Sequence, residues 1–426
     1  MHNKKHVVVS GRALYLAIII SFIAAVLAFL FIISRYYRFI EVNRLNKQQE
    51  LSDNVVSAIN IAMQDPDFVP FDEAKQVTLF NDTARICSLI KKHWGVHLAI
   101  QAESSWKNLS FRRLALVGRT IGGSDAVGLY LTDHGHYLAV AGDTYLSGRC
   151  YLPKLGARKA YIDGKSFKYR DIVHGETHTS SEKLPSLPDE LSEYLESDLF
   201  GNGNNSDSLV NESYLNRGDL ERSFRKRTVR IYDENEIVLS NVDINGNFRV
   251  QSAEKIIIRE SANLENIVCI APVIEVKEGF NGAVQLFALD TLLLEEDVNL
   301  QYPSALVLSG FGRSSIYMDI ASDCNIAGSV LLFTDSEEGT DVILTIADDT
   351  EINGQVYCTG KVSLRGSVNG SLYCDRLFLQ TRQGYYENHL LDAHIDPTSL
   401  TPAFAGGVIS DMAGGINRNR IVEWLN

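Results

Sequence analysis

The sequence lacks the short motifs that mark several common enzyme classes. Its 426 residues contain no Gly-x-Ser-x-Gly turn, P-loop or Gly-x-Gly-x-x-Gly pattern. Its six cysteines form no Cys-x-x-Cys pair, which excludes a zinc or thioredoxin-like framework. Glycoside cleavage needs two carboxylates at a set separation, and nothing in the sequence places a pair such as Asp348 and Asp349 in a cleft. We therefore expect no enzymatic activity, no catalytic residues and no cofactor.

Negative charge exceeds positive charge beyond the N-terminal region. Residues 1–50 have a net charge of +5, whereas residues 51–426 have a net charge of −18. An acidic domain of this kind is soluble and a poor match for nucleic acid or anionic lipid. We interpret the basic run at residues 222–230 as a solvated edge.

Charged residues are absent from residues 13–34, which form an apolar run. About 22 helical residues span roughly 33 Å, enough to cross a hydrocarbon core. The run is longer than a secretory h-region and does not end in Ala-x-Ala, so it predicts an uncleaved transmembrane helix rather than a signal peptide. A buried core helix is the other alternative. Residues 13–34 would bind membrane lipid.

Basic residues flank this run almost equally, so their count does not fix the orientation. Long domains cross membranes largely regardless of charge, which favours an N-terminus inside and the main domain outside. We expect a single-pass protein of a bacterial inner (cytoplasmic) membrane, with most of the chain periplasmic or extracellular.

The N-terminal third divides into four predicted segments. Apolar residues at three- and four-residue steps extend the helical pattern until Pro66. This helix either packs on its own domain or assembles with other helices. The segments are a basic tail (1–12), the transmembrane helix (13–34), a helical stalk (35–65) and a small mixed segment (66–113) with a helix over 72–94 and a strand over 97–101.

From residue 114 onward, short apolar stretches alternate with Gly, Asn and Asp. A short unit recurs in which a small, usually polar residue precedes a glycine and apolar residues alternate after it. The unit is clearest at Gly328, Gly354 and Gly370. Short repeated strands favour a parallel β-helix over the alternative, an antiparallel sandwich. The predicted β-helix covers residues 114–385, with a loop-rich insertion over about 175–225. A C-terminal extension with a capping helix at 419–425 occupies residues 386–426.

Cys358 and Cys374 occupy equivalent positions in two copies of the repeat. Stacked strands lie about 4.8 Å apart, within reach of a disulfide. The pair is therefore either a disulfide or two buried thiols.

Two histidine-containing segments have some of the residues of a metal site. His174, Glu176 and His178 alternate along one face of an extended segment, and Asp133, His134 and His136 form a similar group. Zinc needs three or four ligands in a tetrahedral arrangement. Both segments fit solvated turns better, so we expect no metal ligands.

Two resemblances arise from these patterns. Residues 352–379 resemble polymer-forming β-helix proteins of the bactofilin type, which implies short rungs that stack without chemistry. The segment from Gly11 and Arg12 into the apolar run resembles minor pilins and K-type pseudopilins. That resemblance implies leader processing after Gly11.

These observations lead to two functional hypotheses. The first is a membrane-anchored structural or assembly protein of the bacterial cell envelope, such as a pilus-like or secretion-apparatus component, with protein partners. The alternative is a glycan-binding or glycan-cleaving β-helix protein at the cell surface.

Overall fold

The computed structural model describes residues 11–79, 86–121, 126–200, 207–311, 313, 315–334, 341–401, 403–407 and 419–425. The chain is mainly β with a long N-terminal helix, as predicted. It divides into two compact units: residues 1–58, 76–88 and 102–112 form the first, and residues 59–75, 89–101 and 113–426 form the second. Of the predicted basic tail, residues 1–10 lie outside the described residues.

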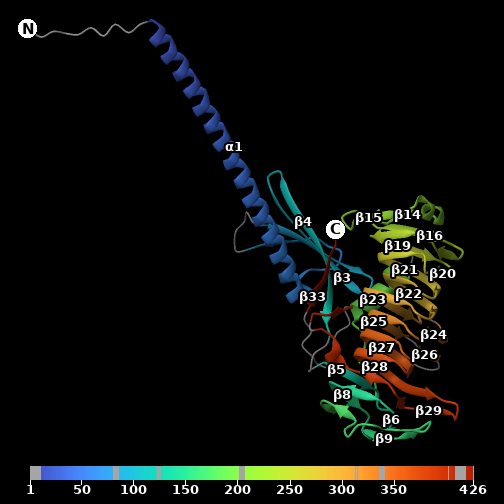
Figure 1. The fold of residues 1–426 in the computed structure, drawn as a ribbon. Helices are drawn as coiled ribbons and strands as arrows, with labels where there is room; N and C mark the ends of the chain where they lie inside the picture. The colour runs from blue at the N-terminus through green and yellow to red at the C-terminus, as the bar shows by residue number, and fades with distance from the viewer. Residues whose placement is uncertain are drawn as a thin grey trace, which may run out of the picture. The chain divides into compact units, whose positions relative to one another are not determined.

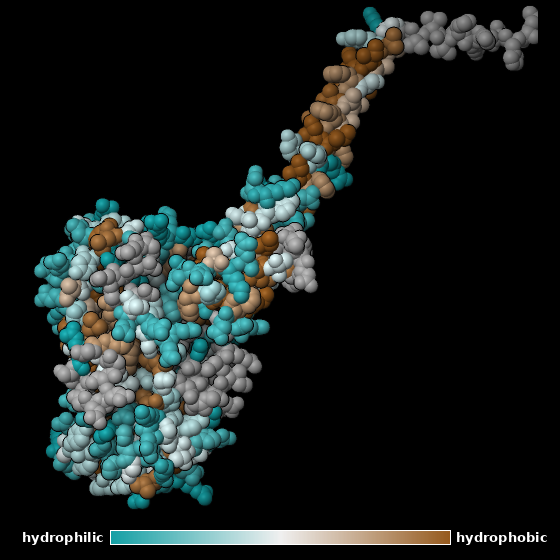
Figure 2. Space-filling model, turned by 180° about the vertical axis from the view of Figure 1, so that it is seen from behind, coloured by the Kyte–Doolittle hydropathy of each residue, from teal (hydrophilic) through white to brown (hydrophobic). Residues whose placement is uncertain are grey.

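Helix α1 (Gly11–Gln64) is one uninterrupted helix of 54 residues (Figure 1). It includes the predicted transmembrane segment and stalk and ends before Pro66, as expected. Figure 2 shows apolar residues over much of its N-terminal part. By length and composition this helix could cross a membrane.

Within the first unit, the later part of α1 has an amphipathic character. Leu51 and Val55 are buried, whereas the apolar side chains of the first turns are exposed. The ammonium group of Lys47 lies 5.3 Å from the centroid of the Trp106 ring. This part of the helix therefore contacts its own chain, as expected for a packed amphipathic helix.

A six-stranded sheet contains the segment that follows α1. Its strands are β1 (Lys75–Thr78), β2 (Ile86–Trp94), β3 (His97–Trp106), β4 (Leu109–Thr120), β32 (Ala405–Gly406) and β33 (Asn419–Leu425). The strand predicted over 97–101 is present as part of β3. Strand β4 extends across the predicted boundary at residue 114.

The prediction of a helix over residues 72–94 is wrong, because β1 and β2 occupy most of that segment. The buried residues Cys87, Leu89 and Lys91 alternate along β2, which is the period of a strand. Lys91 is only 3% exposed, and its ammonium group lies 3.9 Å from the centroid of the Phe71 ring. A lysine therefore occupies one of the buried positions, so the apolar residues alone do not show the alternation.

The predicted capping helix over 419–425 is also wrong. The segment is strand β33, which pairs antiparallel with β4. Ile421 lies opposite Val117 and Leu425 lies opposite Leu114. The apolar residues of β33 therefore extend a sheet, and their spacing alone did not distinguish the two structures.

The larger sheet contains 22 of the described strands. They are β5 (Val127–Leu131), β7 (Tyr145–Ser147), β8 (Arg149–Leu152), β12 (Val173–His174), β13 (Thr177–Thr179), β14 (Ser208–Val210), β15 (Leu220–Arg222), β16 (Val229–Asp233), β17 (Ile237–Leu239), β18 (Asp243–Gly246), β19 (Phe248–Ser252), β20 (Lys255–Ile258), β21 (Asn263–Val276), β22 (Asn281–Leu294), β23 (Asn299–Ser309), β24 (Ser315–Ile320), β25 (Asn325–Phe333), β26 (Asp341–Ile346), β27 (Glu351–Leu364), β28 (Ser367–Gln380), β29 (Tyr385–Glu387) and β31 (His394–Ile395).

Smaller elements complete the fold. They are β6 (Leu138–Ala141), β9 (Ala157–Lys159) and β30 (His389–Leu391) in one sheet, the hairpin of β10 (Tyr161–Ile162) and β11 (Lys165–Ser166), the helices α2 (Asp189–Glu193), η2 (Tyr194–Leu199) and η3 (Glu212–Arg217), and the short turns η1 (Pro66–Phe68) and η4 (Pro397–Ser399).

Parallel pairing in the larger sheet joins equivalent positions of successive segments of the chain. Asn299 lies between Asn281 on one neighbouring strand and Asn325 on the other. The glycines of the sequence repeat share this register, since Gly354 lies opposite both Gly328 and Gly370. The copies of the repeat are therefore stacked on one another in the sheet.

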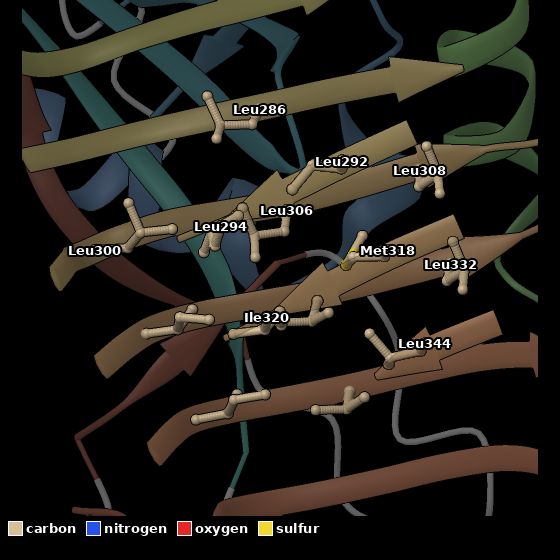
Figure 3. Packing of buried hydrophobic residues seen from close by; sticks show 14 of the residues in the cluster. Leu286, Leu292, Leu294, Leu300, Leu306, Leu308, Met318, Ile320, Leu332 and Leu344 are labelled. Atoms are coloured by element: carbon tan, nitrogen blue, oxygen red, sulfur yellow. The ribbon is translucent and has the colours of Figure 1, made fainter. Parts of the chain in front are cut away.

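Aliphatic side chains in register form the core of the larger sheet (Figure 3). Leu292 lies opposite Met318, and Met318 lies opposite Leu344 on the next strand. Leu308 and Leu332 form an equivalent pair. All five side chains are fully buried, so each strand buries one face against its neighbours.

The order of strands departs from the order of the chain at one position. Strand β28 pairs with β5, with Leu372 opposite Leu129. Strand β5 pairs with β8, and β8 pairs with β13. Residues 127–179 therefore continue the sheet beyond its C-terminal strands, whereas β14, which lies inside the predicted insertion, pairs with β16.

Part of the predicted insertion over 175–225 belongs to the larger sheet, as strands β13, β14 and β15, and another part covers an outer face of that sheet. Its expected short helix is present as α2 and continues into η2. Leu191 and Leu195 are buried in a second apolar cluster that includes Phe287 and Leu331. The Tyr357 hydroxyl donates a hydrogen bond to the carbonyl of Pro185 at 3.0 Å. These described residues of the insertion are therefore packed against the larger sheet.

Candidate functional site

Cys358 and Cys374 lie opposite each other on β27 and β28. Both are fully buried, and both are free thiols in the structure. Burial raises the pKa of the Cys358 thiol to about 12 and that of Cys374 well above its ordinary value. The adjacency expected from the repeat is present, and the disulfide stays a prediction that peptide mapping under non-reducing conditions would test.

Gly11 and Arg12 are the first two residues of α1, and both are exposed. A peptide bond at this position would be accessible, and the processing predicted from the pilin resemblance stays a prediction.

The two histidine-containing segments do not converge on a metal site. The ring of His174 stacks on Tyr145 at 4.7 Å, and the ring of His178 stacks on Tyr151 at 5.0 Å, on two separate strands. His134 Nε2 instead lies 2.8 Å from Asp375 Oδ1. Among the described residues, no cluster of three His, Cys, Asp or Glu side chains has the arrangement of a metal site.

Carboxylates on the outer face of the larger sheet occur in ion pairs with lysines. Lys255 Nζ lies 2.7 Å from Glu275 Oε1, and Lys277 Nζ lies 3.0 Å from Glu275 Oε2. Lys277 also lies 2.7 Å from Glu295. The hydrogen bond from Lys255 lowers the pKa of Glu275, and that from Lys277 lowers the pKa of Glu295. A general acid needs the opposite shift, and burial raises the pKa of Asp319, which lines the same surface cavity as Glu275 and Glu295.

Side chains of both positive and negative charge line a cavity of about 390 Å³ in the second unit. This volume falls within the range of small-molecule sites. Five cationic side chains line it, together with two carboxylates, Asp72 and Asp207. The cationic residues are Lys92, Arg225, Lys226, Arg227 and Arg249.

Arg249 is the buried cation of this cavity. It is 8% exposed, and its Nη1 lies 3.7 Å from Asp207 Oδ2. Its Nε has no hydrogen-bond partner among the described residues. Arg249 also lies opposite Arg230 in the parallel register. Burial raises the pKa of Asp207 despite these two guanidinium groups. Positive charge therefore exceeds negative charge in this buried region.

Residues 223–228 form a basic loop that borders the cavity. Hydrogen bonds from side chains to its backbone hold this loop in place. Arg222 Nε and Nη2 donate hydrogen bonds to the Arg227 carbonyl at 3.0 and 2.8 Å. Asn247 Nδ2 donates to the Lys226 carbonyl at 2.8 Å and, through its Oδ1, accepts from Thr228 at 2.9 Å. The Arg225 amide donates to the Ser223 hydroxyl. The loop backbone is fixed while its cationic side chains are exposed.

Aromatic rings form another part of the cavity wall. Trp94 and Phe224 meet edge to face with ring centroids 5.0 Å apart. His93 stacks between Phe71 and Tyr194 at 4.5 and 4.4 Å. Burial, with Lys91 close by, lowers the pKa of His93 to about 4, so its ring is neutral at pH 7. Neutral polar groups, from Gln101, Thr228 and Asn247, also line the cavity.

This cavity was not predicted from the sequence. Its contributors come from strands β2, β3 and β19 and from the loop after β15, so no local motif contains them. The available signal was a run of three cationic residues, 225–227, inside a strongly acidic domain. We interpret the longer basic run at residues 222–230 as a solvated edge; its residues 225–227 are exposed and also line the cavity.

Comparison of this chain with protein-family models, with curated proteins and with solved structures finds no match.

Proposed function

We propose that this chain is a membrane-anchored structural or assembly protein of the bacterial cell envelope. The observation that carries the proposal is the exposed, uncharged apolar segment at the start of one continuous helix, α1. An exposed apolar surface of this size is unstable in water and stable in a bilayer. The other end of the helix is amphipathic and contacts its own chain.

The larger sheet supports the proposal that residues 127–395 form a parallel β-helix. Its strands pair in parallel with segments that follow them in the chain, and equivalent residues lie opposite each other. Successive turns of a β-helix are related in this way. Aliphatic side chains stack along its interior in the manner expected of rungs. A bactofilin-like repeat would fit this arrangement, but β5 continues the sheet beyond β28, so one end is built by a segment distant in sequence.

A non-enzymatic role agrees with the charges of the outer face. Glu275 and Glu295 are neutralised by lysines, which is unfavourable for the paired acid and nucleophile of a glycosidase. We accordingly favour the structural role over glycan cleavage.

The finer parts of the proposal follow from the sequence. The protein would be single-pass in the inner membrane, with the N-terminal tail (residues 1–12) inside and most of the chain periplasmic or extracellular. Protein partners in a pilus-like or secretion assembly, and a mature start at Arg12, follow from the resemblance to minor pilins.

One pair of variants tests the membrane anchor. Replacing Ala24 and Leu27 with Arg places two charges in the apolar segment, each costing about 3 kcal/mol in a bilayer. We expect the full-length variant to leave the membrane fraction on alkaline carbonate extraction. The matched control replaces Asn46 and Gln48, both exposed on α1 beyond the apolar segment, with Arg. If the Ala24/Leu27 variant stays in the membrane fraction, the proposed anchor is wrong.

A second experiment tests the assembly role. The full-length protein is crosslinked in its native membrane and purified, and its partners and N-terminal sequence are determined. Envelope-assembly components and a mature start at Arg12 would support the proposal. Depolymerase activity of the purified protein on envelope polysaccharides would refute it.

A further inference from the structure

We propose that the cavity lined by Arg249, Trp94 and the basic loop binds an acidic saccharide unit, a sugar ring that bears a carboxylate or a phosphate group. This inference does not depend on the membrane assignment or on the assembly role, because all lining residues belong to the second unit.

The charge of the cavity points to an anion. Five cationic and two acidic side chains line it, in a chain whose residues 51–426 have a net charge of −18. A concentration of positive charge in an acidic domain is not explained by solubility, for which the surrounding carboxylates suffice. Among the described residues, the side chains of Arg225, Lys226 and Arg227 have no carboxylate within ion-pair distance.

Arg249 provides a second observation, independent of the net charge, that points to an anion. A guanidinium group at 8% exposure normally has its donors satisfied, because an unpaired buried donor costs about 1–3 kcal/mol. Its Nε has no partner among the described residues, and its contact with Asp207 is 3.7 Å, longer than a hydrogen bond. The Nη groups of this guanidinium likewise form no hydrogen bond with the described residues, and a carboxylate or phosphate oxygen in the cavity would accept hydrogen bonds from them.

The other residues that line the cavity indicate a ligand that contains a ring with hydroxyl groups. Trp94 and Phe224 meet edge to face in this wall, and the half-buried Phe224 ring offers an apolar surface of the kind that packs against the faces of sugar rings. Gln101, Thr228 and Asp72 add hydrogen-bonding groups for hydroxyls. The volume of about 390 Å³ suits one or two sugar units.

The backbone of the basic loop makes the site preorganised. The bonds from Arg222 and Asn247 hold the loop carbonyls in the structure without a ligand. Binding then requires ordering of side chains only, which lowers its entropic cost.

Calorimetric titration of the full-length protein in detergent or nanodiscs tests the proposal. The probes are glucuronate, glucose 6-phosphate, glucose and inorganic phosphate. We expect glucuronate or glucose 6-phosphate to bind at least tenfold more tightly than glucose and inorganic phosphate. Tighter binding of glucuronate than of glucose 6-phosphate would indicate a carboxylate ligand, and the reverse order would indicate a phosphate ligand. Equal binding of inorganic phosphate and the acidic sugars would overturn the saccharide part, and absence of binding by all four would overturn the proposal.

Matched variants locate the binding. Replacing Arg225, Lys226 and Arg227 with Gln removes three exposed charges and leaves the backbone bonds of the loop in place. We expect at least a tenfold loss of affinity. The control replaces three exposed cations outside the cavity, Lys154, Arg158 and Arg382, with Gln, and should keep its affinity. Equal losses in both variants would show a general charge effect and refute the site.

Arg249→Lys serves as a conservative variant. It keeps the charge beside Asp207 but removes the planar guanidinium group with its Nη donors, so we expect weaker binding with an unchanged unfolding midpoint. Unchanged affinity would contradict the role given to Arg249.

Discussion

Gly370 lies opposite Gly354 in the parallel register, and a β-carbon added at Gly370 would overlap the carbonyl oxygen of Gly354. Gly354 has the same relation to Gly328. The φ angles of Gly354 and Gly370 are 156° and 150°, a region that favours glycine. The recurrent glycine of the sequence is therefore required where successive strands approach most closely.

Replacing Gly370 with Ala should destabilise the protein by about 3 kcal/mol, because both the contact and the backbone angle become unfavourable. The measurement is the free energy of unfolding from urea titration of the full-length protein. Gly384→Ala is the control, since its nearest neighbouring atom would be 4.0 Å from the new β-carbon. Equal stability of the two variants would show that close packing does not explain the repeat.

The helix and the glycine repeat could be predicted because their signals are local. The apolar run and the three- and four-residue spacing determine one helix that ends before Pro66. Gly354 and Gly370 occupy the same place in two successive copies of the repeat and lie opposite each other in space, so the periodicity directly gives the register.

Other features could not be predicted because they depend on distant pairings. Nothing near Leu129 indicates that it lies opposite Leu372. The apolar spacing over residues 419–425 does not reveal strand β33, because its partner β4 lies far earlier in the chain. The cavity depends on Trp94 and Arg249, which meet only in the folded chain.

Gln285 joins the larger sheet to the turn between β2 and β3. Its Oε1 accepts a hydrogen bond from the Val96 amide at 2.9 Å, and its Nε2 donates to the Trp94 carbonyl at 3.2 Å. Gln285 is 4% exposed, so Gln285→Ala would leave two buried backbone groups unpaired. We expect a loss of about 2–4 kcal/mol in the free energy of unfolding.

Limited proteolysis should also show faster cleavage near Trp94 in the Gln285→Ala variant. Gln301→Ala is the control, because Gln301 is exposed and its side chain donates only to the Asn281 side chain. Unchanged stability and unchanged cleavage in Gln285→Ala would mean that this contact is dispensable.

Cys358 and Cys374 should be unreactive in the reduced, folded protein. Burial raises the pKa of Cys358 to about 12, so almost no thiolate is present at pH 8.5, and neither sulfur is accessible. We expect no alkylation by iodoacetamide until the protein is unfolded. An exposed cysteine introduced as Ser166→Cys provides the comparison. Alkylation of Cys358 in the folded protein at the rate of that control would contradict its burial.

His97 should make the protein sensitive to acid. It is 2% exposed, and neither ring nitrogen has a hydrogen-bond partner among the described residues. Burial lowers its pKa from 6.5 to about 4. The unfolded chain therefore takes up a proton first as the pH falls, and the free energy of unfolding decreases between pH 6.5 and pH 4, by roughly 3 kcal/mol at most. Above pH 6.5 this group has no effect.

His97→Leu should remove this part of the pH dependence, because leucine fills the buried position without a titrating group. The check is the free energy of unfolding from urea titrations at pH 7.5, 6, 5 and 4. His136→Leu is the matched control, since His136 is exposed. Parallel curves for the wild-type protein and His97→Leu across this range would show that His97 does not titrate on unfolding, whereas a flatter curve for His97→Leu alone would confirm the assignment.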